Sequence, residues 1–190
     1  VPLSIASTNF RYVFSGRYLN IFARLNTYLP NDIVCFEAED TDENFHSNSS
    51  AVKKRYVYKI LNREFPDAVM NRYSWHYKYP LDIEKMQIAA KAFIGEHDFI
   101  GFASSGFSVK TTVREIYSLD VDKNGDIITI DVVGNGFLYN MVRIIAGTLV
   151  FVGGGKINTN DMTDIINSKD RERAGITAPP QGLCLKEVYY

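Results

Sequence analysis

Alternating polar and apolar positions predict several short strands along the chain. The clearest is Arg55–Ile60, where β-favouring side chains alternate with basic ones. Two further strands, Val113–Asp122 and Asp126–Val133, are joined through Asn124-Gly125, a dipeptide typical of tight β-hairpins. Leu183–Tyr189 predicts a last strand near the end of the chain.

Other segments before residue 80 carry weaker signals. Phe10–Phe14, Ile33–Glu39 and Tyr73–Tyr77 are short runs that favour strands. Leu25–Asp32 predicts a turn-rich stretch, because its Pro-Asn dipeptide breaks regular structure.

Apolar residues spaced three and four apart predict helices after residue 80. One begins after Asp82, whose side chain suits a helix N-cap, and stops at Gly95. Phe137–Val152 predicts an almost wholly apolar helix that ends in three glycines, and Asp161–Ser168 predicts a short one. Because helices occur together with β-hairpins, the predicted fold class is α+β with a mixed, mainly antiparallel sheet.

The apolar segment Phe137–Val152 could be mistaken for a membrane span. A span needs about 20 apolar residues and avoids a central arginine, whereas this segment contains Arg143. We therefore interpret it as a core helix and expect no membrane association. Its predicted buried stripe consists of Leu138, Met141, Val142, Ile145, Leu149 and Val152.

Arg143 lies off that stripe, inside an otherwise apolar element. A guanidinium in such a place is costly unless an anion meets it or its head reaches water. A structural ion pair, a surface arginine whose stem packs on apolar neighbours, and an arginine that holds a functional anion are all compatible with the pattern.

The strand around residue 56 has two chemically different faces. One face carries Lys54, Tyr56, Tyr58 and Ile60, and the other carries Lys53, Arg55, Val57 and Lys59. Basic residues interleaved with aromatic ones suit RNA, which offers both phosphates and stackable bases. A half-buried strand with a solvated basic face explains the same alternation.

The composition is that of a folded globular protein. With 190 residues, 46% hydrophobic and 23% charged, the chain is too apolar for disorder and long enough for one domain or two small ones. The net charge of −1 mildly opposes extensive phosphate contacts. Charge is segregated, however, with acidic residues gathered over 37–43 and basic residues over 53–59.

No metal site is predicted. Cys35 and Cys184 are far apart in the sequence, and the three histidines show no ligand spacing. We interpret His76 as a strand residue whose ring nitrogens are satisfied locally. Two isolated cysteines and the lack of a signal-peptide pattern at Val1–Asn9 favour the cytoplasm.

Five segments, in matching order and spacing, resemble the tRNA pseudouridine synthase A (TruA) family. They are Leu25–Ile33, Phe45–Tyr58, Gly95–Phe99, Phe137–Gly147 and Gly182–Leu185. Any one of these matches is weak, but five together are specific, and they run along most of the chain.

The sequence departs from the family at the nucleophile. The family's catalytic aspartate lies in a Gly-Arg-Thr-Asp-x-Gly-Val-x-Ala motif, whereas here Ser15-Gly16-Arg17 is followed by Tyr18-Leu19-Asn20. We expect a catalytic loop to belong between Arg17 and Tyr18, and the first strand and helix of the family's N-terminal half to be missing as well. The alternative is a paralogue without a nucleophile.

The resemblance implies an isomerase that converts uridine to pseudouridine at positions 38–40 in the anticodon stem-loop of tRNA. It implies no metal or organic cofactor, a homodimer, and two related α+β halves around a central cleft. Residues 1–50 would be the remainder of the N-terminal half, and residues 51–190 the C-terminal half. A non-catalytic RNA-binding module is the alternative function.

The resemblance also assigns residues. Arg143 matches the arginine that pairs with the catalytic aspartate, which favours a functional anion as its partner. Tyr56 matches the tyrosine that stacks on the target base and acts in proton transfer, and Arg17 matches a backbone or base-flipping contact. Further substrate contacts are expected from Tyr58, Lys54, Arg55 and Arg114. Tyr56 and Arg143 should line one cleft ringed by basic residues.

Overall fold

The computed structural model describes most of the chain, namely residues 12–13, 21–35, 38–39, 41–106 and 109–190. Near the N-terminus, strands β1 (Tyr12–Val13) and β2 (Ala38–Glu39) pair in parallel, and helix α1 spans Ile21–Tyr28. Most of the strand predicted at Phe10–Phe14 lies outside the described residues.

Helix α1 corrects the turn predicted at Leu25–Asp32. The helix continues to Tyr28 and ends two residues before Pro30, because proline disfavours helical backbone at the residue before it. The side chain of Asn26 then ties the helix to the returning chain through two hydrogen bonds with the backbone of Cys35. Of the strand predicted at Ile33–Glu39, the described part contains only β2.

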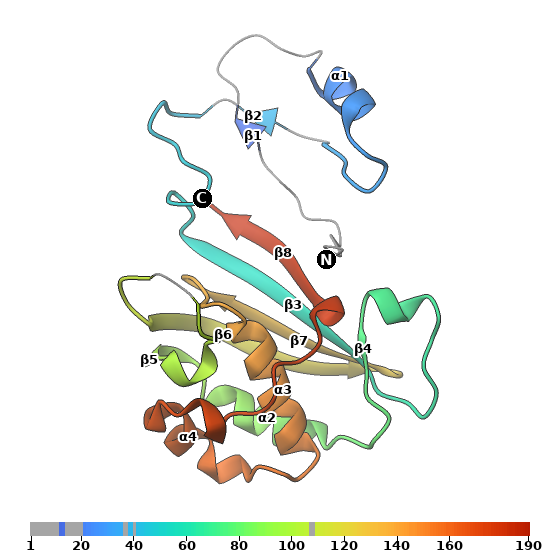
Figure 1. The fold of residues 1–190 in the computed structure, drawn as a ribbon, viewed down its shortest axis with the longest axis vertical. Helices are drawn as coiled ribbons and strands as arrows, with labels where there is room; N and C mark the ends of the chain where they lie inside the picture. Colours follow the sequence, from blue (N-terminus) through green and yellow to red (C-terminus); the bar gives the residue numbers. More distant parts are fainter. Residues whose placement is uncertain (1–11, 14–20, 36–37, 40, 107–108) are drawn as a thin grey trace.

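The larger part of the protein is built on one six-stranded sheet. Its strands are β3 (Lys53–Leu61), β4 (Trp75–His76), β5 (Gly95–Asp98), β6 (Val113–Asn124), β7 (Ile127–Gly134) and β8 (Leu183–Tyr189). The order is β4-β3-β7-β6-β5, and β8 pairs with the other half of β3 on the side of β4 (Figure 1). Only β3 and β4 are parallel within this sheet, which confirms the predicted α+β class.

The hairpin predicted at Asn124-Gly125 is confirmed. Asn124 pairs with Ile127, so the connection is a two-residue loop. Its first residue, Gly125, has φ 57°, a left-handed value that glycine adopts without steric cost.

Three α-helices are interspersed among the strands of this sheet, one between β4 and β5 and two between β7 and β8. Helix α2 (Ile83–Lys91) begins as predicted, because the side chain of Asp82 accepts a hydrogen bond from the backbone N–H of Lys85. Helices α3 (Met141–Gly153) and α4 (Met162–Ser168) complete the set. The predicted start of α3 at Phe137 is wrong, because Asn140 has φ 62° and this left-handed backbone separates the preceding turn from the helix.

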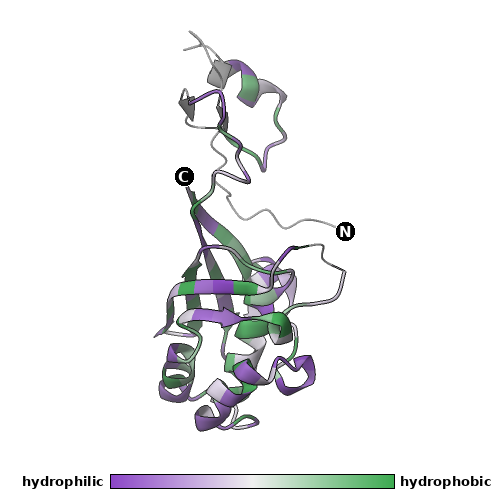
Figure 2. Ribbon diagram, turned by 90° about the vertical axis from the view of Figure 1, so that its left-hand side faces the viewer, coloured by the Kyte–Doolittle hydropathy of each residue, from purple (hydrophilic) through white to green (hydrophobic). Residues whose placement is uncertain are grey.

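The core lies between the sheet and these helices. One face of the sheet supplies fully buried side chains, among them Tyr58 and Ile60 of β3 and Ile130 of β7. Figures 1 and 2 show α2, α3 and α4 on one side of the sheet. The alternating residues of β3, such as Arg55 and Lys59, are partly or fully exposed on the other face.

Helix α3 is buried on nearly all sides. All residues of the predicted stripe are buried, and so are Ile144, Ala146 and Val150 on its other sides. This explains why the segment is apolar throughout. No helix in the described part of the chain is long and apolar enough to cross a membrane.

Two glycines let the segment of residues 174–179 cross α3 at very short range. A Cβ on Gly147 would overlap the carbonyl oxygen of Ile176, and a Cβ on Gly175 would lie 2.5 Å from the backbone of Thr148. The hydroxyl of Thr148 accepts a hydrogen bond from the N–H of Gly175, and the N–H of Ala178 donates to the carbonyl of Arg143. The crossing therefore sets the position of residues 178 and 179 relative to the start of α3.

Strand β5, which was not predicted, is tied to the end of α4 by an ion pair. The carboxylate of Asp98 lies 2.8 Å from Nζ of Lys169 and accepts a hydrogen bond from Thr112. The hydrogen bond from Lys169, followed by that from Thr112, lowers the pKa of Asp98.

We expect Asp98→Asn to lower the free energy of unfolding by about 1 kcal/mol at pH 7. A lowered carboxylate pKa contributes stability above the ordinary value of about 3.9 and loses it as pH falls through the folded-state pKa. The difference in Tm between the wild type and the variant should therefore shrink between about pH 5 and pH 3. Asp122→Asn, on an exposed position of β6, is the control. A difference that stays constant over this range would contradict the assignment.

Candidate active site

Arg143 lies in the first turn of α3, and two neutral oxygens hold its guanidinium. Its Nε donates to the carbonyl of Ala178 at 2.6 Å, and its Nη1 donates to Oδ1 of Asn140 at 2.8 Å. None of the ion pairs within the described residues includes Arg143. The guanidinium is thus fixed in place while its charge is not compensated by a carboxylate from this part of the chain.

Tyr58 lies close to Arg143, because the two side chains donate to the carbonyls of the adjacent residues Pro179 and Ala178. Its side chain is 0% exposed, and its hydroxyl donates to the carbonyl of Pro179 at 2.7 Å. Burial raises the pKa of Tyr58, and the positive charge of Arg143 opposes part of that shift. This burial corrects the expectation that Tyr58 contacts substrate, because a ring without exposed surface cannot stack on a base.

Tyr56 occupies the next position on the same face of β3, about 7 Å along the strand from Tyr58. It is partly buried, and its ring meets the ring of Phe137 edge to face, with centroids 5.2 Å apart. Burial raises the pKa of Tyr56. The phenol is therefore protonated at neutral pH and can donate a hydrogen bond or a proton.

The loop from Gly134 to Asn140, which we call the β7–α3 loop, contacts Tyr56 and Arg114 and leads into the helix that carries Arg143. Phe137 packs over Gly134, where an added Cβ would lie 3.2 Å from the ring and 2.7 Å from a backbone oxygen of β6. Arg114 passes Gly136, with Nε at 3.5 Å from the position of an added Cβ. Through this loop the structure brings Tyr56, Arg114 and Arg143 to one region of the fold.

Lys54 belongs to the same region. It pairs with Gly134 in the register of β3 and β7, and it shares the face of Tyr56. Its Nζ lies 3.4 Å from Oδ1 of Asn48. Lys54 and Arg114 are thus the two basic residues, among those predicted, that flank Tyr56 and the β7–α3 loop.

Arg55 does not lie in the same region as Lys54 and Arg114. It lies on the opposite face of β3, where its Nη2 is 2.6 Å from Oδ2 of Asp131. The hydrogen bond with Asp131 raises the pKa of Arg55, and its charge is locally matched. Arg17 and its junction with Tyr18 lie outside the described residues.

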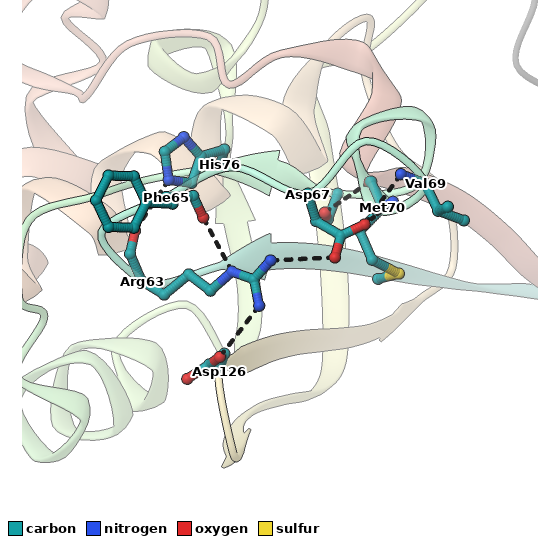
Figure 3. A network of polar contacts seen from close by, with 8 residues as sticks. Arg63, Phe65, Asp67, Val69, Met70, His76 and Asp126 are labelled. Carbon is teal, nitrogen blue, oxygen red and sulfur yellow. Dashed lines mark hydrogen bonds and ion pairs between the residues drawn. The ribbon is translucent and has the colours of Figure 1, made fainter.

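A second arginine near the far end of β3 is also neutralised. Arg63 contacts the carboxylates of Asp67 at 3.0 Å and Asp126 at 3.6 Å (Figure 3). The ring nitrogen Nε2 of His76 lies 2.9 Å from the carbonyl of Arg63, which confirms the interpretation of His76 as locally satisfied. Within the described residues no group of three or more His, Cys, Asp or Glu side chains could hold a metal ion.

Three residues of the site were not identified from the sequence. Phe137 supports the ring of Tyr56, Asn140 holds Arg143, and Ser104 holds Asn140. Phe137 and Asn140 lie within the four residues before α3, and the single arginine of that helix could have drawn attention to them. Nothing in the local sequence marks Ser104, because its contact spans 36 residues.

The site thus combines an arginine that has no acidic partner among the described residues, a partly buried tyrosine and flanking basic residues on an α+β scaffold. A family model described as tRNA pseudouridine synthase matches residues 89–190, a range that includes β6, β7, α3 and β8. The chain belongs to the tRNA pseudouridine synthase family.

Its relatives agree with this assignment. The tRNA pseudouridine synthase A of Thermoanaerobacter sp. (strain X514) is 54% identical over 166 residues, which cover 87% of this chain and 68% of the relative. The tRNA pseudouridine synthase A of Bacillus subtilis (strain 168) is 43% identical over 189 residues, which cover 100% of this chain and 72% of the relative. The resemblance inferred from five sequence segments is confirmed.

Proposed function

We propose that this protein isomerises uridine to pseudouridine at positions 38–40 in the anticodon stem-loop of tRNA. The observation that carries the proposal is the guanidinium of Arg143, which no carboxylate of the described residues neutralises and which is fixed at the N-terminus of α3 on the same side of β3 as Tyr56. The positive end of the helix dipole adds to its charge, so this place favours a carboxylate. Family membership supplies the reaction type that such a carboxylate would serve.

The chemistry assigned to the site needs an aspartate from the family's Gly-Arg-Thr-Asp motif. Its carboxylate attacks either the ribose C1′ or the uracil ring, and the bond between C1′ and N1 breaks. The uracil turns and C5 bonds to C1′. The bond that the aspartate had formed breaks, which returns the free carboxylate, the C5 proton is lost, and N1 gains a proton. Arg143 keeps the attacking carboxylate ionised, because a nearby cation lowers a carboxyl pKa.

Tyr56 serves the step that brings the base into the site. A base must leave its stack to be reached, which costs a few kcal/mol, and stacking on an aromatic ring offsets part of that cost. The ring of Tyr56 is held from the side by Phe137, which leaves a supported and only partly buried platform. Lys54 and Arg114, with Arg17, would meet the RNA backbone.

In this proposal residues 51–190 are the C-terminal half of the synthase, and residues 1–50 are the remainder of the N-terminal half. The catalytic loop belongs between Arg17 and Tyr18, and the gene sequence across that junction should encode Thr-Asp after Arg17. A direct Arg17-Tyr18 junction in the gene would favour a paralogue without a nucleophile.

The proposed function is tested by release of tritium from C5. We expect tRNA labelled with [5-³H]uridine to lose tritium to water when the protein is added in the presence of a metal chelator. Replacing the motif aspartate by alanine should abolish release while tRNA binding persists, because binding is spread over many phosphate contacts. Full tRNA binding without any release by the wild type would instead favour a non-catalytic RNA-binding module.

We expect Tyr56→Phe to bind tRNA almost as well as the wild type and to lower kcat on the order of 10²-fold. The substitution keeps the ring and its contact with Phe137 and removes the hydroxyl that transfers a proton. Filter binding and tritium release measure the two effects separately. Tyr117→Phe, at an exposed position of β6, is the control. An unchanged kcat would show that Tyr56 acts by stacking only.

The family resemblance further supports a homodimer in the cytoplasm as part of this proposal. Sedimentation equilibrium of the purified protein should give twice the mass of the chain. A mass equal to one chain at micromolar concentration would contradict the proposed dimer without affecting the proposed reaction.

A further inference from the structure

Asn140 has a backbone conformation that most residues avoid. Its φ is 62° and its ψ is 5°, and among the described residues only Lys169 is another non-glycine residue with positive φ. Asparagine tolerates this left-handed region better than most residues, but the conformation is still less favourable than in glycine. Asparagine, unlike glycine, can offset this conformational cost through contacts of its side chain.

The side chain of Asn140 does not cap helix α3. It stands at the N-cap of α3, where an asparagine normally accepts a hydrogen bond from the helix backbone, and it makes no such bond. Its Oδ1 instead accepts from Nη1 of Arg143 at 2.8 Å. The amide is therefore directed to the arginine and not to the end of the helix.

A second contact fixes the orientation of that amide. Nδ2 of Asn140 donates to Oγ of Ser104 at 3.0 Å, and the backbone N–H of Ser104 donates to the carbonyl of Tyr139 at 3.1 Å. Arg143 can only donate hydrogen bonds, so the oxygen of the amide must face it and the NH₂ group must face Ser104. The segment that follows the 3₁₀ turn Ile100–Phe102 thus supports the arginine through one intermediate side chain.

The two bonds to Arg143 leave most of its donors available. A guanidinium has five N–H donors, and Ala178 and Asn140 occupy one each. The bond at Nε and the bond at Nη1 together fix both the position and the plane of the group. A planar group held in this way is prepared for a carboxylate, which arginine prefers to bind through two parallel hydrogen bonds.

We propose that Asn140 is a positioning residue: its amide holds the guanidinium of Arg143 in the orientation that meets the catalytic carboxylate, and Ser104 holds the amide. This inference rests on the proposed function and adds a residue to it. A purely structural N-terminal asparagine would be replaceable by glycine without any effect on turnover.

Two substitutions separate these roles. Asn140→Gly keeps the left-handed backbone and removes the amide, so kcat for tritium release should fall about tenfold while the KM for tRNA and Tm stay close to wild type. Asn140→Asp keeps shape and backbone but gives Arg143 an acidic partner that competes with the catalytic carboxylate. Its kcat should fall further, on the order of 10²-fold. Asn158→Asp, at the start of the 3₁₀ turn Thr159–Asp161, is the matched control and should leave kcat unchanged.

A readout that does not depend on turnover accompanies the kinetics. The Nη1–H of Arg143, which donates to Asn140, should give an NMR signal that exchanges slowly with water in the wild type and faster in Asn140→Gly and Ser104→Ala. A wild type that releases no tritium would contradict the proposed function itself. With an active wild type, Asn140→Asp at full kcat, or Nη1–H exchange unchanged in Asn140→Gly, would overturn the role of Asn140 alone.

Discussion

Substituting methionine for Arg143 is expected to lower kcat for tritium release on the order of 10³-fold, because it removes a preorganised cation from the reacting carboxylate. Methionine fills much of the same volume, so the core around α3 should stay intact. Affinity for tRNA should change little, since phosphate contacts elsewhere provide most of it. Single-turnover tritium release and filter binding measure the two quantities.

Two variants control this result. Arg72→Met removes an exposed charge from a side chain that makes no hydrogen bond or ion pair among those identified in the described residues, and should leave kcat at the wild-type value. Arg143→Lys keeps the charge but cannot serve Ala178, Asn140 and a carboxylate together, so its kcat should lie between wild type and Arg143→Met. Equal kcat for Arg143→Met and Arg72→Met would remove Arg143 from the active site.

Gly147→Ala is expected to lower the free energy of unfolding by about 3 kcal/mol, at the upper end of the usual cost of overpacking. The new methyl group would overlap the carbonyl of Ile176, a backbone atom that can move only if the whole crossing segment moves. Because Ala178 follows in that segment and accepts from Arg143, kcat should fall as well. Urea unfolding followed by circular dichroism gives the change in stability.

Gly136→Ala is the control, because an added Cβ there meets nothing closer than 3.5 Å and the nearest atom belongs to a flexible side chain. It should change the free energy of unfolding by less than about 0.5 kcal/mol. If Gly147→Ala unfolds at the same urea concentration as Gly136→Ala, the close approach of residues 174–179 to α3 is contradicted.

The strands that form the centre of the fold were predictable from alternation and turn chemistry. β3, β8 and the β6–β7 hairpin occur where the pattern places them, because each is long enough for the period of two to be visible. Strand β5 was not predicted, because its four residues, Gly95–Asp98, carry no apolar alternation and are held by pairing with β6. The apolar run of α3 hid its start, because the break at Asn140 is a backbone feature and not a change in hydrophobicity.

The site was only partly predictable. Alternation correctly separated Tyr58 from Arg55, but it does not say which face of a strand the helices cover. The helices cover the aromatic face, so Tyr58 is in the core, while Arg55 is matched by Asp131 on the open face. The support of Arg143 comes from residues 35 or more positions away, Ala178 directly and Ser104 through Asn140, and no local pattern encodes such contacts.

The central claim is that Arg143 is the partner of the catalytic carboxylate. It is tested most directly by titrating that carboxyl group, with ¹³C NMR of the aspartate in the Gly-Arg-Thr-Asp motif, in the wild type and in Arg143→Met. The pKa of this carboxyl group should be higher in the variant, because the nearby cation that favours its ionised form is gone. The same pKa in both proteins would contradict it.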